Sequence, residues 1–325
     1  MFILSEGPLA RIDRRCEIEE VKLIGIHGRR RLPGVRHEGW RTWRNTDLVG
    51  GMDTRFSLDR KVVVVTGGVR GVGAGICRTF LQAGSTVVAC ARRDSDAPVE
   101  AAGRVAEFLP CDIRDPDQVQ RLVDSVVERH GRLDVLVNNA GGAPFALAAD
   151  ASPKFHAKII ELNLLGPLLV SQHANAVMQS QDSGGSIVNI SSVSGSRPSP
   201  GSAAYGAAKA GLDSLTGSLA VEWAPKVRVN AVVVGMVHTE LAHLHYGDDE
   251  GIAAVGATVP LGRMATPEDV GNCVAFLASP LAAYVSGSTL TVDGGGERPA
   301  FLAAATVNEA TVDEAVVNEA AGEKG

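Results

Sequence analysis

Tyr205 and Lys209 are the two residues whose types and spacing most directly suggest acid–base chemistry. They stand four positions apart in SAAYGAAKAGLDSL, a stretch that predicts a helix, so both side chains lie on one face. A free phenol has a pKa near ~10, and an adjacent ammonium group favours the phenolate. The pair therefore predicts a general acid or base, although a packing helix with a solvated lysine has the same spacing.

A glycine-rich loop follows the first predicted strand, in the order Thr66-Gly67-Gly68-Val69-Arg70-Gly71-Val72-Gly73. Glycines let the backbone turn tightly and approach a pyrophosphate, whose charge is favoured at the amino end of the following helix. A purely structural turn also needs glycines. The strand before the loop and the helix after it nevertheless favour dinucleotide binding.

Together these motifs resemble those of the short-chain dehydrogenase/reductase family, and of its 3-oxoacyl-carrier-protein reductases in particular. The first loop of the family is TGxxxGxG, as it is in this chain. The family also arranges four catalytic residues in the order and spacing found here for Asn163, Ser192, Tyr205 and Lys209.

The resemblance implies a role for each of these four residues. A hydride added to a carbonyl leaves an alkoxide, which Tyr205 would protonate in reduction, acting as a base in oxidation. Lys209 would lower the pKa of Tyr205 and hold the nicotinamide ribose. Ser192 would hydrogen-bond the substrate oxygen, and Asn163 would anchor a water that relays protons to Lys209. Ser191 is rejected as the catalytic serine on spacing alone.

Further contacts to the cofactor also follow from the resemblance. Asp112 would accept from the adenine amino group, Asn139 would support the sheet and the cofactor edge, and Thr239 would contact the nicotinamide amide. The match covers about 240 residues, up to Asp293-Gly294-Gly295, and departs at Val234-Gly235, where the family has Pro-Gly. The predicted cofactor-binding residues are Gly67, Arg70, Gly71, Val72, Gly73, Arg92, Asp112, Asn139, Tyr205, Lys209 and Thr239.

Two arginines predict which nicotinamide cofactor is used. An acidic residue about 20 positions after the glycines would bind the ribose hydroxyls of NAD, but this chain has Ala91-Arg92-Arg93 there. If Arg92 and Arg70 converge on one place, they suit a 2′-phosphate through charge-assisted hydrogen bonds. NADP(H) is therefore predicted over NAD(H), the alternative being that both arginines are solvated surface charges.

The fold predicted from the apolar pattern is α/β, with a doubly wound parallel sheet. Near-continuous valine and isoleucine runs indicate strands buried on both faces. Asp115 and Gly131 are expected to begin and end one helix. The predicted strands include residues 61–66, 86–91, 133–137, 186–191, 227–234 and 289–292, and a helix is predicted over 72–83. With the resemblance, this is a single Rossmann-type domain.

Three regions are expected along the chain. Residues 53–300 form the NADP-binding domain. Residues 1–51 are a basic, poorly ordered extension or the product of an upstream start, since Met52 leads directly into the first strand. Residues 303–325 form an acidic low-complexity tail with the repeat TVNEA, TVDEA, VVNEA, expected to be disordered or a docking appendage.

Composition excludes several classes of function. The net charge of −6 argues against a nucleic-acid-binding protein, and no uncharged apolar run approaches the roughly 18 residues of a membrane span. Five scattered cysteines predict reduced thiols and a cytoplasmic location rather than disulfides. No metal site is expected, because His238, His243 and His245 lack a supporting frame of ligands.

The sequence thus predicts an NADP(H)-dependent oxidoreductase acting on a small-molecule ketone or secondary alcohol. By resemblance it is a homotetramer or dimer that packs two long helices, near 153–180 and 202–224. A dinucleotide-sensing regulator without turnover is the alternative, though it would not need the acid. A methyltransferase is disfavoured by the arginines and by Tyr205 and Lys209.

Overall fold

The computed structural model describes residues 58–297 and 299–301. The predicted extension over 1–51 and the predicted tail over 303–325 lie outside these residues.

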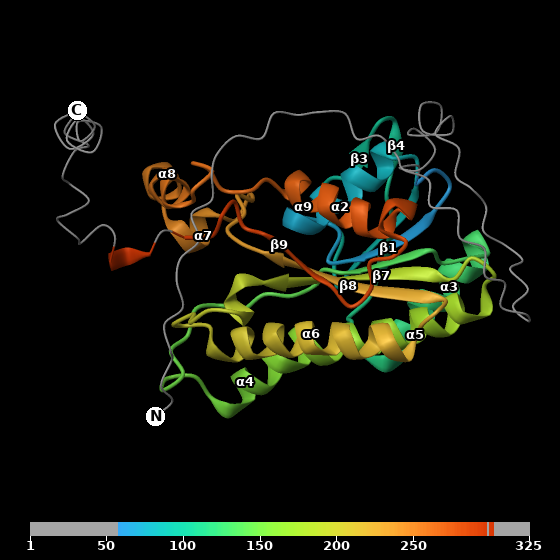
Figure 1. The fold of residues 1–325 in the computed structure, drawn as a ribbon, viewed down its shortest axis with the longest axis horizontal. Helices are drawn as coiled ribbons and strands as arrows, with labels where there is room; N and C mark the ends of the chain where they lie inside the picture. Colours follow the sequence, from blue (N-terminus) through green and yellow to red (C-terminus); the bar gives the residue numbers. More distant parts are fainter. Residues whose placement is uncertain (1–57, 298, 302–325) are drawn as a thin grey trace, which may run out of the picture. The chain divides into compact units, whose positions relative to one another are not determined.

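A parallel sheet forms the centre of the fold (Figure 1). Within residues 58–297 it has seven strands, in the order β5-β2-β1-β6-β7-β8-β9, and every pairing in it is parallel. The predicted doubly wound parallel sheet is therefore confirmed. The strands are β1 (Val62–Thr66), β2 (Thr86–Ala91), β5 (Glu107–Pro110), β6 (Val135–Asn138), β7 (Gly185–Ser192), β8 (Val227–Val234) and β9 (Thr289–Val292). A separate short hairpin joins β3 (Glu100–Ala101) and β4 (Arg104–Val105).

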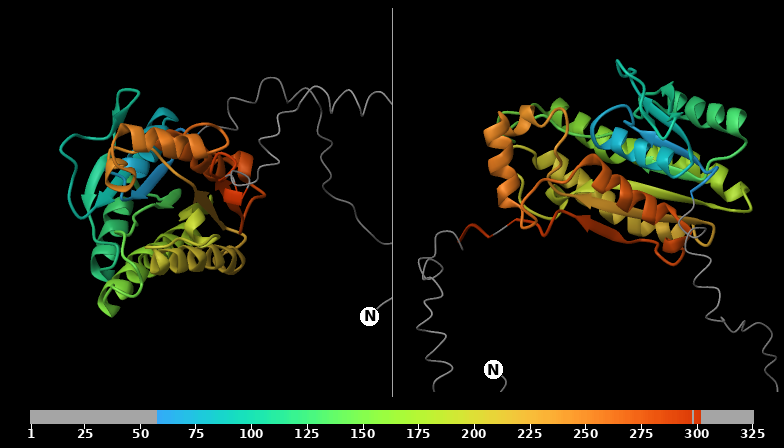
Figure 2. Two further views of the ribbon diagram at one scale, coloured as in Figure 1. Left: turned by 90° about the vertical axis from the view of Figure 1, so that its left-hand side faces the viewer. Right: turned by 90° about the horizontal axis from the view of Figure 1, so that it is seen from above.

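Helices cover both faces of the sheet (Figures 1 and 2). α2 (Gly71–Gln82) and α9 (Pro267–Ala278) pack on one face. The other face is covered by α3 (Pro116–His130), α5 (Gly166–Ser180) and α6 (Ala203–Glu222). Shorter helices are α4 (Pro153–Ile160), the π-helix η2 (Glu161–Leu165), η3 (Val193–Gly195), α7 (His243–Tyr246), α8 (Asp249–Thr258) and η4 (Pro280–Ala282). None of the helices within the described ranges is long and apolar enough to cross a membrane.

Strand β1 shows why the apolar runs form this architecture. Successive side chains point to opposite faces of a strand. Val63 and Val65 therefore join the core beneath α2 and α9, whereas Val62 and Val64 join the core beneath α3, α5 and α6. β-Branched side chains suit such strands because they pack well on a pleated surface.

Local signals set the helix ends. The Asp115 carboxylate accepts from the N–H groups of Asp117 and Gln118 at the start of α3, and Gly131 ends the helix with φ 72°. Both boundaries are as predicted. The long helix expected near 153–180 is interrupted by the π-helix η2, which carries Asn163.

The strand order determines where a ligand can bind. β1 pairs with β2 on one side and β6 on the other, so the connections after β1 and β6 leave in opposite directions. A crevice opens at the carboxyl ends of parallel strands at such a point.

A buried carboxylate ties β1 to β6. Asp134, which is 5% exposed, accepts hydrogen bonds from Lys61 Nζ (3.0 Å), the Val62 N–H (3.0 Å) and Arg132 Nε (2.7 Å). Burial raises the pKa of the Asp134 carboxyl, but the hydrogen bonds from Arg132, Val62 and Lys61 outweigh burial. The pKa therefore lies below its usual range.

Asp134→Asn is expected to lower the free energy of unfolding by about 2–3 kcal/mol at neutral pH, because hydrogen bonds to a buried charge are weakened. Since the pKa is depressed in the folded state, this contribution is present above the unfolded-state pKa and is lost as pH falls through the folded-state pKa. Urea denaturation should therefore show the difference shrinking on acidification. Asp124→Asn, on the exposed face of α3, is the control, and an equal loss there would contradict the prediction.

Candidate active site

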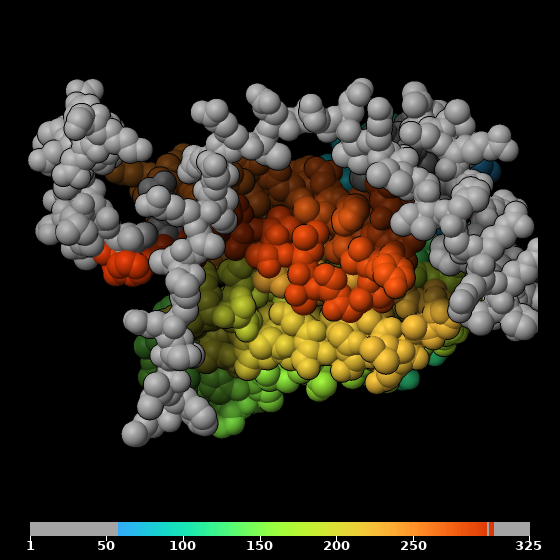
Figure 3. All heavy atoms as spheres, in the orientation of Figure 1, coloured from blue at the N-terminus to red at the C-terminus, as the bar shows by residue number. Residues whose placement is uncertain are grey.

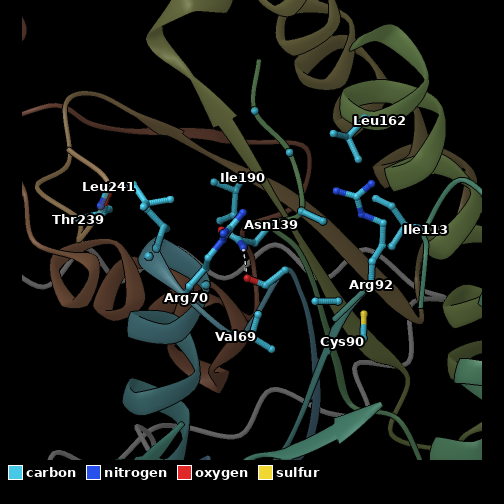
Figure 4. Close-up of a pocket in the computed structure, with 18 of the residues that line it drawn as sticks. Val69, Arg70, Cys90, Arg92, Ile113, Asn139, Leu162, Ile190, Thr239 and Leu241 are labelled. Atoms are coloured by element: carbon cyan, nitrogen blue, oxygen red, sulfur yellow. Dashed lines mark hydrogen bonds between the residues drawn. The ribbon is translucent and has the colours of Figure 1, made fainter. Parts of the chain in front are cut away.

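A pocket of about 1130 Å³ opens at the carboxyl ends of the strands (Figure 4). Its lining comes from the glycine loop, the ends of β2, β5, β6, β7 and β8, the helix α6 and the segment 237–245. All of the predicted catalytic and cofactor-binding residues line it except Asn163.

Three of the predicted catalytic residues lie together. Ser192 is the last residue of β7, while Tyr205 and Lys209 lie one turn apart on α6. The Ser192 hydroxyl hydrogen-bonds Tyr205, and Lys209 Nζ lies 5.5 Å from the centroid of the Tyr205 ring. Lys209 Nζ also donates to the Ile190 carbonyl (2.8 Å), which fixes the ammonium group against β7. Ser191, rejected from the sequence, is 2% exposed and packs beneath α6.

Burial governs the ionisation of both α6 residues. It lowers the pKa of Lys209 to about 8, an effect opposed by the charge of Asp213. It raises the pKa of Tyr205, and the hydrogen bond with Ser192 offsets part of that rise. We expected Lys209 to lower the pKa of Tyr205. Within the protein the pKa is instead raised, because desolvation of the phenolate dominates.

Asn163 lies behind the pocket rather than in it. The residue is fully buried on η2. Its Oδ1 accepts from the Gly142 N–H (2.8 Å), and its Nδ2 donates to the carbonyls of Gly142 (3.0 Å) and Ile159 (2.9 Å). A methyl group built on Gly141 would lie 2.7 Å from Asn163 Oδ1 and 3.4 Å from Lys209 Nζ. Asn163 therefore holds the segment that borders Lys209, and its role as a water anchor stays a prediction.

The glycine loop is braced against the end of β6. Thr66 Oγ1 accepts from the N–H groups of Asn139 (3.0 Å) and Ala140 (2.9 Å), and Asn139 Nδ2 donates to the carbonyls of Thr66 (2.9 Å) and Gly67 (3.2 Å). Gly67 has φ 63°, a left-handed conformation that glycine adopts readily. A Cβ at Gly73 would lie only 2.2 Å from the Gly67 carbonyl oxygen, so glycine is required there.

The amino end of α2 faces this pocket, and its N-cap residue supplies no side-chain cap. Arg70 at the N-cap makes no capping hydrogen bond, and the first turn contains no acidic residue. The Glu240 carboxylate, from the segment after β8, accepts the Gly71 N–H at 2.8 Å. This end of the helix therefore attracts an anion, as expected from the helix dipole. Sequence reasoning did not identify Glu240, because the contact spans 169 residues.

The predicted arginines line one pocket but do not converge. Figure 4 shows Arg92 beside Ile113 and Leu162, and Arg70 nearer to Asn139. The positive charge of Arg92 contributes to lowering the pKa of Asp112, although the main cause is the hydrogen bond from Arg114.

Arg114 is a further charged residue that sequence reasoning did not identify. Its Nε and Nη2 pair with the two Asp112 oxygens at 2.9 and 2.6 Å. The Asp112 carboxylate, predicted to bind adenine, is thus already oriented by Arg114. The spacing Asp-x-Arg was the available signal for this pair.

The donor set fits a dinucleotide phosphate. It offers a helix amino end whose N-cap residue supplies no cap and a glycine loop that Cβ atoms would obstruct. Three arginines on the pocket wall, Arg70, Arg92 and Arg93, form no ion pair with a described residue. In the described part of the chain, no group of three or more histidine, cysteine or acidic residues is arranged to hold a metal ion.

Comparison with known proteins gives a family match over most of the chain. Residues 67–297 match the family model described as enoyl-(acyl carrier protein) reductase. The 3-oxoacyl-[acyl-carrier-protein] reductase of Thermotoga maritima is 36% identical over 245 residues, covering 73% of this chain and 98% of the relative. The cis-4-hydroxycyclohexanecarboxylate dehydrogenase of Sinomonas cyclohexanicum is 39% identical over 241 residues, covering 72% and 96%.

Solved structures agree with the sequence comparison. The ligand-free aldohexose dehydrogenase of Thermoplasma acidophilum matches with a TM-score of 0.68 and 36% identity, covering 73% of this chain and 94% of the other.

Gly73→Ala is expected to weaken dinucleotide binding by about 1–3 kcal/mol, since the new methyl group forces α2 and the glycine loop apart. Gly256→Ala is the matched control, because its methyl group would meet only ordinary contacts, the nearest at 3.6 Å. Titration with NADPH and with NADH, followed by nicotinamide fluorescence, measures both variants. Wild-type affinity in Gly73→Ala would show that the close approach is not needed.

Proposed function

Because this chain belongs to the short-chain dehydrogenase/reductase family of nicotinamide-dependent oxidoreductases, we propose that it reduces small-molecule ketones with NADPH, using Tyr205 as the acid. The observation that carries this proposal is the meeting of Ser192, Tyr205 and Lys209 in one pocket at the carboxyl ends of the strands. Two of the relatives, a 3-oxoacyl-[acyl-carrier-protein] reductase and a cis-4-hydroxycyclohexanecarboxylate dehydrogenase, support a ketone or secondary alcohol as the substrate.

The chemistry divides between the cofactor and the chain. When bound, the nicotinamide supplies the hydride for reduction. Ser192 then hydrogen-bonds the substrate oxygen as negative charge develops on it, and Tyr205 gives that oxygen its proton. Burial keeps the Tyr205 phenol protonated, which is the form required at the start of a reduction. Lys209, held against Ile190, places a positive charge beside the phenolate that remains.

The choice of NADP(H) is part of the same proposal. Arg92 and Arg70 are exposed on the pocket wall, and neither takes part in an ion pair with a described residue. Arg114, by contrast, is neutralised by Asp112. Arg93 also lines the pocket without an ion pair to a described residue, so three guanidinium groups are available to a phosphate. Because Arg70 and Arg92 do not converge, the 2′-phosphate is proposed to bind at Arg92.

An oligomer in the cytoplasm completes the proposal. α6 and the segment leading to β9 reach the surface on one side of the molecule (Figure 3). β9 ends the sheet and leaves one side of the strand without a partner among the described residues. Val221 on α6 is 80% exposed and Tyr284 before β9 is fully exposed. These features support a homotetramer or dimer that uses α6 and its neighbouring helices.

Tyr205→Phe tests the catalytic assignment. We expect turnover to fall by about 10²–10⁴-fold with NADPH binding retained, because only the acidic proton is lost. Loss of absorbance at the nicotinamide band, across a panel of ketones, quinones and β-ketoacyl thioesters, measures turnover. Tyr284→Phe, on an exposed tyrosine, should leave turnover unchanged. Surviving turnover in Tyr205→Phe would mean that another group donates the proton.

Arg92→Ala tests the cofactor choice. The loss of charge-assisted hydrogen bonds is expected to raise the Kd for NADPH by about ten- to a hundredfold, with little change for NADH. Arg104→Ala, on the exposed β4, is the control. Equal losses for both cofactors would contradict phosphate recognition by Arg92.

A further inference from the structure

Asp213 is a partly buried acidic residue to which the proposed reaction assigns no role. It lies one turn after Lys209 on α6. Its carboxylate hydrogen-bonds the side chain of Ser191, yet its Oδ1 is buried and has no hydrogen-bond partner among the described residues. Burial raises the pKa of Asp213, with Ser191 and Lys209 opposing the rise. An unsatisfied buried carboxylate oxygen is costly, so its presence requires an explanation.

Lys209 is likewise a charged side chain in a buried place. Its side chain is 3% exposed, and Nζ makes one hydrogen bond, to the Ile190 carbonyl, among the described residues. An ammonium group in such a place is destabilised by desolvation. Residues four apart on a helix are neighbours, at about 5–6 Å between Cβ atoms, so each charge lies within the other's field.

Within the described part of the chain, the other elements around Lys209 contribute uncharged groups. β7 contributes the Ile190 carbonyl, and η2 contributes Asn163. The segment after β6 contributes Gly141, and on α6 itself the titratable neighbour besides Asp213 is Tyr205. Among the charged groups of the described residues, Asp213 is the one whose field acts to keep Lys209 protonated.

We propose that Asp213 is a positioning residue of the active site, whose carboxylate holds the Lys209 side chain in its ammonium form. This inference rests on the proposed function, in which the Lys209 charge stabilises the phenolate of Tyr205. A side chain that only filled the space beneath α6 would be better as an apolar residue, since it would avoid the desolvation of a carboxylate.

This pairing predicts how the rate of the reaction depends on pH above neutrality. Without the Asp213 charge, the Lys209 ammonium loses its proton at lower pH. The positive charge beside Tyr205 then disappears within the working range. The field of Asp213 thus widens the pH range over which the site can function.

The direct test is an NMR titration of Lys209 that needs no substrate. The chain has seven lysines, so protein labelled with [¹³C]lysine gives a small set of signals, and Lys209→Met assigns the one of interest. The wild-type midpoint is expected near 8. Asp213→Asn, which keeps the side-chain shape, is expected to lower it by about one pH unit. An unchanged midpoint would overturn the proposal.

Three further variants separate charge from structure. Glu222→Gln removes the same charge from the exposed end of α6 and should leave the Lys209 midpoint unchanged. Ser191→Ala removes the hydroxyl contact but keeps the carboxylate, so a shift as large as that of Asp213→Asn would contradict an electrostatic role. If Asp213→Asn does not fold, Asp213→Glu decides, because it must keep the wild-type midpoint.

Kinetics then test the connection with turnover. For any ketone reduced by the wild type, the alkaline limb of kcat/KM should move to lower pH in Asp213→Asn by the same amount as the Lys209 midpoint. A shifted midpoint with an unmoved limb would refute the role of Asp213 in the reaction. If no ketone is reduced, the proposed function fails, and the NMR titration still reports on the pair.

Discussion

The pairing of β1 with β6 at the middle of the sheet is the constraint on which the active site depends. Because the two strands are neighbours, the glycine loop after β1 and the Asn139 segment after β6 meet at one edge. Asp134 fixes the opposite ends of the same two strands. The crevice is therefore a consequence of strand order. The helices on both faces bury the sheet beneath the crevice in two apolar cores.

Within that crevice, burial opposes charge at each residue assigned to proton transfer. Desolvation disfavours the phenolate of Tyr205 and the ammonium of Lys209 at once. A protonated phenol suits a site that must give up a proton, while the lysine needs local support to keep its charge. For Lys209, the Ile190 carbonyl accepts a hydrogen bond from the ammonium group, and the charge of Asp213 opposes the effect of burial. For Tyr205, the hydrogen bond with Ser192 offsets part of the rise in pKa. The site is thus arranged as much by what lies beneath α6 as by what faces the pocket.

Local sequence signals predicted the parts of the molecule that local physics determines. The strand runs, the Asp115 cap and the Gly131 terminus depend on neighbouring residues, and the structure reproduces them. The meeting of Ser192, Tyr205 and Lys209 in one pocket could be expected because the family motifs preserve their order and spacing. The π-helix at Asn163 was not predicted, and the hydrogen bonds that Asn163 makes there reach Gly142, 21 residues away. The expected convergence of Arg70 and Arg92 failed for a similar reason, since side-chain direction depends on the packed surroundings.

The contacts that sequence reasoning missed differ in the sequence separation of the two residues involved. Glu240 reaches Gly71 across most of the domain, so no spacing could indicate it. Asp112 and Arg114 are two positions apart, so their ion pair could have been predicted from the sequence. Asp213 stands four positions after Lys209, a spacing that predicts contact. What the sequence could not show was that one oxygen of this carboxylate is buried without a partner. A helical acid–lysine pair is ordinarily a solvated surface feature, whereas here Lys209 and one oxygen of Asp213 are buried, which is why we propose that the pair belongs to the active site.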